Sequence, residues 1–103
     1  MVPCGICIAI PDGFAGLVVP RSGLAARHGI TVLNAPGLID SGFRGEINAI
    51  LYNSDKDQSF EIESGDRIAQ LMIVRIPHME FNISESLGET ARGAEGFGSS
   101  GIS

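Results

Sequence analysis

The sequence lacks any apolar run long enough to cross a lipid bilayer, although 44% of its 103 residues are hydrophobic. Its apolar start has no basic segment, and Pro11 interrupts it early, so we expect no signal peptide. The cytoplasm is therefore the expected location, and no membrane partner is expected. The length predicts a single domain over residues 1–103.

Positive charge is scarce. Seven basic and twelve acidic residues give a formal net charge of −5, which argues against a surface that binds nucleic acid. Six of the basic residues are arginine, and Lys56 is the one lysine. Because a guanidinium group presents a planar set of donors to phosphate oxygens, this composition favours a small anionic ligand bound at one place.

Residues that bind metals through sulfur or nitrogen are also few. Cys4 and Cys7 form a C-x-x-C pattern without a second pair, and His28 and His78 are not spaced to complete a metal site. Residues three apart in a strand point to opposite faces, so the two cysteines are expected to be buried free thiols.

Short apolar runs separated by turn residues predict an all-β domain. The strands are expected over residues 2–10, 14–19, 30–33, 46–53, 59–63, 68–76 and 79–83. The run over 68–76 reads as a buried strand whose Gln70 amide needs partners. One short helix is expected after Arg21, with Ser22 as its cap and Gly29 at its end. Residues 84–103 are polar and glycine-rich, which predicts a flexible C-terminal arm.

The stretch NAPGLIDSGFRGEINAILYN over residues 34–53 predicts a β-hairpin around the Ser41-Gly42 turn. Asp40 stands at the rim of this turn. An aspartate is ionised at neutral pH and can accept a proton from water. The alternative is that Asp40 caps the turn through its own backbone, and the hairpin by itself favours that second interpretation.

Two further segments suggest phosphate contacts. Arg21, Ser22 and Gly23 enter the expected helix, where a guanidinium, a hydroxyl and backbone amides converge; the alternative is an ordinary capped helix with a solvent-facing arginine. The tail has the spacing G-x-G-x-x-G over residues 96–101, but no helix follows, and no G-K-[ST] occurs. The tail is either a flexible linker or a segment that folds over a nucleotide.

In this order the segments resemble the motifs of the trimeric dUTPases, which hydrolyse dUTP to dUMP and pyrophosphate, limiting uracil in DNA and supplying dUMP for dTMP synthesis. Residues 20–25 resemble the second motif, 34–46 the third, 65–71 the fourth, and 92–101 the fifth. The resemblance implies a distorted jelly-roll subunit, a homotrimer, and active sites between subunits. It implies Asp40 as the base that activates water, and Mg²⁺ bound through the triphosphate with no protein metal site.

The resemblance also assigns the substrate contacts. A hairpin reads uracil through its backbone, an aromatic ring excludes a ribose 2′-hydroxyl, and arginine, hydroxyl and amide groups hold phosphates. The tail closes from a neighbouring subunit, with Phe97 stacked on the base. The implied substrate-binding residues are Arg21, Ser22, Gly23, Asn34, Gly37, Leu38, Ile39, Asp40, Phe43, Asn48, Gln70, Arg92, Phe97, Gly98 and Ser99.

The sequence departs from the family pattern at three points. The first motif, of the form A-G-x-D-L, is absent, so we expect either a piece of a longer protein or a reduced version lacking an N-terminal strand or two, with metal binding and turnover in doubt. Phe43 replaces a tyrosine, and Asn48 replaces a longer or basic residue. Two alternatives stay open: dCTP deaminase, which shares the fold but needs a glutamate where Ile50 stands, and a non-catalytic nucleotide-binding trimer.

Overall fold

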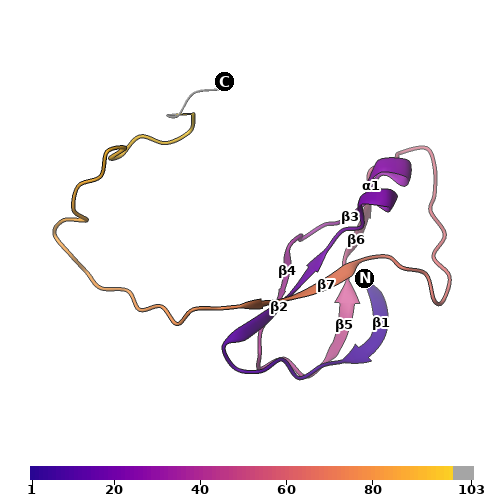
Figure 1. Cartoon of the computed structure of the whole chain (residues 1–103). Helices are drawn as coiled ribbons and strands as arrows, with labels where there is room; N and C mark the ends of the chain where they lie inside the picture. The colour runs from indigo at the N-terminus through magenta and orange to yellow at the C-terminus, as the bar shows by residue number, and fades with distance from the viewer. Residues whose placement is uncertain (99–103) are drawn as a thin grey trace.

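The computed structural model describes residues 1–98, which form short strands and one helix (Figure 1). The elements in chain order are β1 (Val2–Cys7), β2 (Phe14–Val19), α1 (Ser22–His28), β3 (Ile30–Val32), β4 (Gly37–Ile39), β5 (Glu46–Ala49), β6 (Leu51–Asn53) and β7 (Gln70–Arg75). The predicted all-β class with one short helix is confirmed.

Strand β2 lies at the centre of the largest sheet. It pairs antiparallel with β4 on one side and with β7 on the other, so that Gly16 lies opposite both Ile39 and Ile73. Two further antiparallel pairs, β1 with β5 and β3 with β6, complete the sheets among the described residues. Every pairing of β2 is between segments far apart in the sequence, so β2 sets the distance between the loops that follow β4 and precede β7.

The core joins the three sheets. Its central cluster takes one buried side chain from each sheet: Val18 from β2, Val32 from β3 and Ile47 from β5. Burying an aliphatic side chain of this size stabilises a fold by roughly 1.5–3 kcal/mol. The partly buried residues packed around the cluster are Ile8, Ile39, Leu51 and Ala69.

The helix begins one residue earlier than the sequence suggests. Arg21 is the N-cap, with an extended backbone at φ −95° and ψ 128°, and no side chain caps the first turn. The prediction that Ser22 is the cap is therefore wrong, because the Ala25 amide already donates to the Arg21 carbonyl at 3.0 Å and places Ser22 inside the helix. Gly29 ends α1 in the left-handed region at φ 66°, as predicted.

The predicted β-hairpin over residues 34–53 is not formed. Strand β4 pairs with β2, whereas β5 pairs with β1 and β6 with β3. The run 46–53 divides at Ile50, whose carbonyl accepts a hydrogen bond from the Leu33 amide at 2.7 Å. The chain changes sheet at this residue, which is how strands turn corners in sandwich folds.

Three expectations about the later strands are wrong. Residues 59–63 and 79–83 alternate in polarity but form no strand, because nothing in the described part of the protomer offers them a backbone partner. The run 68–76 shortens to β7, and it is exposed: Leu71, Met72 and Ile73 keep 39%, 49% and 51% of their surface accessible. None of the residues of β7 is buried.

Cys4 and Cys7 are exposed free thiols, so the prediction of buried thiols is wrong. The regular alternation on which it depended is broken within β1. Gly5 has a positive φ of 75°, and the pairing register with β5 shifts between Pro3 and Cys7. A β-bulge of this kind re-aims the side chains on either side of it.

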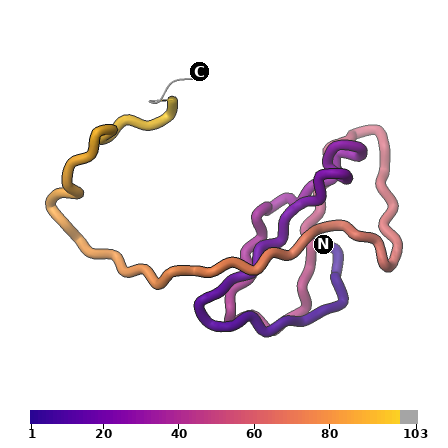
Figure 2. Tube along the Cα trace, viewed as in Figure 1, coloured from indigo at the N-terminus to yellow at the C-terminus, as the bar shows by residue number. Residues whose placement is uncertain are grey.

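The chain after β7 extends away from the folded body as an arm (Figures 1 and 2). The Cα radius of gyration is 19.0 Å, against about 13 Å for a compact chain of this length, because the arm lengthens the molecule to 54 Å. The domain boundary at residue 84 stays a prediction. Over the described residues, no helix is long and apolar enough to cross a membrane.

The left-handed end of α1 yields a stability prediction. A methyl group added in Gly29→Ala would meet the Ser54 hydroxyl and keep an unfavourable φ of 66°, so we expect a loss of about 2 kcal/mol in the free energy of unfolding in urea. Gly13→Ala is the matched control, since φ is 86° and nothing lies within 4 Å of the added methyl; it should lose about 1 kcal/mol. Equal losses would contradict the packing of Ser54 on Gly29.

The exposed thiols yield a second prediction. Iodoacetamide should alkylate Cys4 and Cys7 in the native protein about as fast as in urea, because neither side chain is buried. Mass spectrometry of Cys4→Ser and Cys7→Ser variants assigns the rate to each thiol. Protection of either thiol in the native protein would show that another part of the assembly covers β1.

Candidate functional site

One cavity gathers the residues predicted to contact the base and the sugar. Its volume is about 230 Å³, and it opens beside the turn that follows β4. The segments that form it are the end of β4, the turn, and β5 with the residue after it. The predicted residues that line it are Leu38, Ile39, Asp40, Phe43 and Asn48, and the others are Met1, Glu46, Ile47 and Ile50.

The turn after β4 holds Asp40 in place through backbone contacts. Its carboxylate oxygen Oδ1 accepts a hydrogen bond from the Gly42 amide at 3.0 Å, and its carbonyl accepts one from the Phe43 amide at 3.3 Å. Asp40 therefore caps its own turn, and it also lines the 230 Å³ cavity as an exposed side chain. The two interpretations of Asp40 are compatible, because one carboxylate can cap the turn and still face solvent.

The Asn34 side chain lies next to the start of β4. A Cβ atom built on Gly37 would lie 3.2 Å from the Asn34 side-chain nitrogen and 3.5 Å from Val18 Cβ. Gly37 is buried between these two neighbours, so the strand backbone approaches the Asn34 amide closely only because residue 37 has no side chain.

A second cavity, of about 720 Å³, contains the predicted phosphate arginine. Arg21 lines it together with residues 62–69, which include the segment that resembles the fourth motif, and with residues 2–5 of β1. Gln70 lies close by, since its side-chain Nε2 donates to the Pro20 carbonyl at 3.1 Å. Ser22 and Gly23 occupy the first turn of α1, directly after Arg21.

The loop on the wall of this second cavity is a tight turn. Asp66 accepts the Glu63 amide through Oδ2 at 2.9 Å, and the Asp66 amide donates back to the Glu63 carbonyl at 3.0 Å. Gly65 supplies the positive φ of 93° that the turn requires. Asp66 is thus a turn residue, and its carboxylate accepts a hydrogen bond from the backbone.

The two cavities share no lining residue, although Pro3 of one pairs with Asn48 of the other across β1 and β5. Ile39 pairs with Gly16 and Gln70 pairs with Val19, so about 10 Å of strand separates the two pairings at roughly 3.3 Å per residue. Asp40 follows Ile39 near the start of β2, whereas Arg21 lies two residues past its end. One protomer therefore keeps the predicted base away from the predicted phosphate residues.

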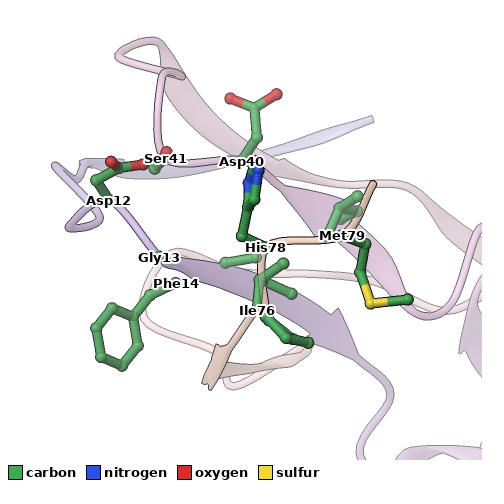
Figure 3. A pocket seen from close by; sticks show the side chains of 11 residues that line it. Asp12, Gly13, Phe14, Asp40, Ser41, Ile76, His78 and Met79 are labelled. Atoms are coloured by element: carbon green, nitrogen blue, oxygen red, sulfur yellow. The ribbon is translucent and has the colours of Figure 1, made fainter. Parts of the chain in front are cut away.

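A third cavity, of about 590 Å³, also reaches Asp40 (Figure 3). Its other walls come from residues 12–15 at the start of β2 and from residues 76–79 after β7. Sequence reasoning gave no role to Asp12, His78 or Met79, which line it with Asp40. These residues are brought together by the β2–β7 pairing, and no local pattern in the sequence signals that pairing.

Up to Gly98, the tail does not reach any of these cavities in its own protomer. The arm that carries Arg92, Phe97 and Gly98 runs away from the body (Figure 2), and the Phe97 side chain is fully exposed. Arg92 instead donates through Nε to the Glu95 carbonyl. Ser99 lies outside the described residues.

The expected Mg²⁺ would need oxygen ligands near these cavities. Within residues 1–98, no group of three or more histidine, cysteine, aspartate or glutamate side chains could hold a metal ion. Mg²⁺ commonly binds through one or two carboxylates together with substrate phosphates. A triphosphate would supply such phosphate oxygens, so the donor groups present are compatible with Mg²⁺ carried by the substrate.

Comparison with known proteins agrees with the fold and the motifs. A model of the dUTPase family matches residues 1–101. The deoxyuridine 5′-triphosphate nucleotidohydrolase of Tropheryma whipplei (strain Twist) is 54% identical over 101 residues, covering 98% of this chain and 69% of that protein. The enzyme of the same name from Wolbachia pipientis subsp. Culex pipiens is 56% identical over 103 residues, covering 98% of this chain and 67% of that protein.

Among solved structures, the dUTPase of Staphylococcus bacteriophage 80alpha with dUPNHPP superposes with a TM-score of 0.79 at 30% identity, covering 93% of this chain and 72% of that one. The predicted jelly-roll class is thereby confirmed. From the match over residues 1–101 and these identities, the chain belongs to the dUTPase family.

Proposed function

We propose that the chain hydrolyses dUTP to dUMP and pyrophosphate in the cytoplasm, as a homotrimer with active sites between subunits. The observation that carries this proposal is the division of the predicted site within one protomer. Leu38, Ile39, Asp40, Phe43 and Asn48 line one cavity, while Arg21 and Gln70 lie near each other at the C-terminal end of β2. A second copy that places its own Asp40 turn against Arg21 completes the constellation.

Asp40 is the general base of the proposed reaction. The Gly42 amide holds Oδ1, so the carboxylate is oriented and Oδ2 accepts the proton of the attacking water. The water oxygen bonds to the α-phosphorus, the bond from that phosphorus to the bridging oxygen breaks, and pyrophosphate leaves. General-base assistance of this kind contributes typically 10²–10⁴-fold to the rate.

Arg21, Ser22, Gly23 and Gln70 hold the phosphates in this proposal. A guanidinium group can bind a phosphate through two parallel hydrogen bonds, and the Ser22 hydroxyl and nearby amides add single donors. The Gln70 side chain is already oriented by the Pro20 carbonyl. Mg²⁺ bound to the triphosphate supplies charge neutralisation on the oxygens that become pyrophosphate.

Uracil is read by the backbone of β4. This strand is at the edge of its sheet and pairs with β2 on one side, so its other side presents backbone donors and acceptors without a strand partner in the described chain. Asn34 lies beside Gly37 at the start of this edge. A site matched to uracil in this way leaves partners unpaired when cytosine binds, which rejects the wrong base by roughly 10⁴-fold or more.

Phe43 and Asn48 line the same cavity and contact the sugar side of the nucleotide in this proposal. The tail closes over the site of a neighbouring subunit, with Phe97 on the base, Gly98 allowing the turn, and Arg92 and Ser99 at the γ-phosphate. Support for a neighbouring subunit comes from the arm, which leaves its own body and keeps Phe97 exposed.

Exposed apolar surface supports the homotrimer. Leu71, Met72 and Ile73 on β7 are exposed, as are Met79 and Phe81 beyond it. Monomeric proteins rarely leave a contiguous apolar surface of this kind in water. Association of copies would cover it and bring the two halves of the site together.

The alternatives make different products. A dCTP deaminase would release ammonia from dCTP, but Ile50 lines the 230 Å³ cavity where that enzyme needs a glutamate. A non-catalytic trimer would bind dUTP without turnover. Assays of pyrophosphate release from dUTP, dCTP and dTTP with Mg²⁺, together with ammonia release from dCTP, separate the three.

Asp40→Asn tests the proposed base. The substitution keeps the shape of the side chain and removes its ability to take a proton, so kcat for dUTP should fall by roughly 10²–10⁴-fold while Kd for a non-hydrolysable dUTP analogue changes little. Asp12→Asn is the matched control, because Asp12 lines the 590 Å³ cavity beside Asp40 and carries the same charge. Normal turnover by Asp40→Asn would show that another group activates the water.

Mixed trimers test the shared site. Refolding equal amounts of inactive Asp40→Asn and Arg21→Ala chains together should restore about a quarter of the parent activity, since that share of interfaces pairs an intact Asp40 with an intact Arg21. The double variant Asp40→Asn/Arg21→Ala mixed with Arg21→Ala should restore none. Absence of recovery in the first mixture, with parent chains refolding normally, would place both residues in a site within one subunit.

A further inference from the structure

Gly45 lies next to the far end of the aromatic ring of Phe43. A Cβ atom built on Gly45 would stand 2.7 Å from Cζ of that ring, 3.0 Å from Cε1 and 3.6 Å from Cε2. Side-chain carbons do not approach one another so closely in folded proteins, so the ring occupies space that any other residue at position 45 would fill. The φ of Gly45 is not in the left-handed region, and the backbone therefore does not itself require glycine.

The turn before Gly45 holds the backbone of Phe43 in place. The Phe43 amide donates to the Asp40 carbonyl at 3.3 Å. The Arg44 guanidinium donates to the Ser41 carbonyl at 2.6 Å and to the Phe43 carbonyl at 3.0 Å. The backbone of Phe43 is thus tied to the residue that bears the proposed base, while the position of the ring depends on contact with Gly45.

The ring itself borders both the cavity and solvent. Phe43 lines the 230 Å³ cavity with Asp40 and Asn48, and 43% of its surface is accessible. The ring atoms nearest to the added group are those at the far end of the side chain, and the side chain is partly exposed, so this end can move toward solvent. A group added under the ring would therefore displace the ring and not the strand, because the end of a side chain moves at lower cost than the backbone.

We propose that Gly45 is a specificity-determining positioning residue: by lacking a side chain it seats the Phe43 ring where the ring excludes the 2′-hydroxyl of a ribonucleotide. This inference rests on the proposed function, in which the ring lies against the sugar. Gly45 touches neither substrate nor reacting atoms and acts through Phe43. A methyl group at position 45 displaces the ring from this position. When a nucleotide binds, the displaced ring rotates toward solvent and leaves space for the 2′-hydroxyl of a ribose.

The test compares Gly45→Ala with Gly42→Ala. The added methyl of Gly42→Ala has Asp40 Oδ1 at 3.5 Å as its nearest neighbour, which is an ordinary contact, and the amide of residue 42 is retained. We measure kcat/KM for dUTP and UTP, and Kd for the α,β-imido analogues of both nucleotides. Gly45→Ala should lose roughly 10- to 100-fold of the preference for dUTP, since exclusion of an added hydroxyl by an apolar wall is worth about 10². Gly42→Ala should keep the parent preference.

A double-mutant cycle shows whether Gly45 acts through the ring. Phe43→Ala alone should relax the preference by a similar factor, and adding Gly45→Ala to it should change nothing further, because the ring that the methyl displaces is gone. If Gly45→Ala does not fold, Phe43→Ala/Gly45→Ala should restore folding, since the clash involves the Phe43 ring. Failure of that rescue would overturn the proposal.

The remaining outcomes separate the two proposals. An unchanged preference in Gly45→Ala, or an effect that persists without the Phe43 ring, would overturn the role of Gly45 and leave dUTP hydrolysis standing. A parent chain that binds neither analogue would overturn the proposed function, and the role of Gly45 with it.

Discussion

The antiparallel pairing of β2 with both β4 and β7 is the constraint on which the rest of the structure depends. Through it, β4, about twenty residues away in the sequence, and β7, more than fifty residues away, are fixed in one register with β2. The turn that bears Asp40 follows one partner of β2, and Gln70 opens the other. Because the three strands are held by backbone hydrogen bonds, the distance between these two functional regions is set by strand geometry and does not depend on flexible side chains.

The sequence predicts well what is decided locally. Gly29 ends α1 in the left-handed conformation, the 63–66 turn forms around Gly65, and β2 has its expected bounds. The motifs also identify residues that the structure brings into one cavity, from Leu38 to Asn48. Each of these features depends on a few neighbouring residues, or on a pattern that the family resemblance supplies.

What the sequence does not predict depends on partners. Alternation over 59–63 and 79–83 describes residues suited to a strand, but pairing needs a second backbone, which the described protomer does not provide. The prediction of a hairpin over 34–53 is wrong for a related reason, because β4 pairs with β2 and β5 pairs with β1. The exposure of β7 and of both thiols likewise follows from which elements cover them. The Phe43–Gly45 contact belongs to the same group, since the letters F-R-G do not show that the ring folds back onto the glycine.

The separation of Asp40 from Arg21 along β2 also affects how the rate of dUTP hydrolysis would depend on protein concentration. Under the proposed assembly no single copy holds a working centre, so function is tied to association by mass action. Dilution would then separate the copies into folded but inactive chains. At low expression, the rate of dUTP hydrolysis would fall more steeply than the protein concentration.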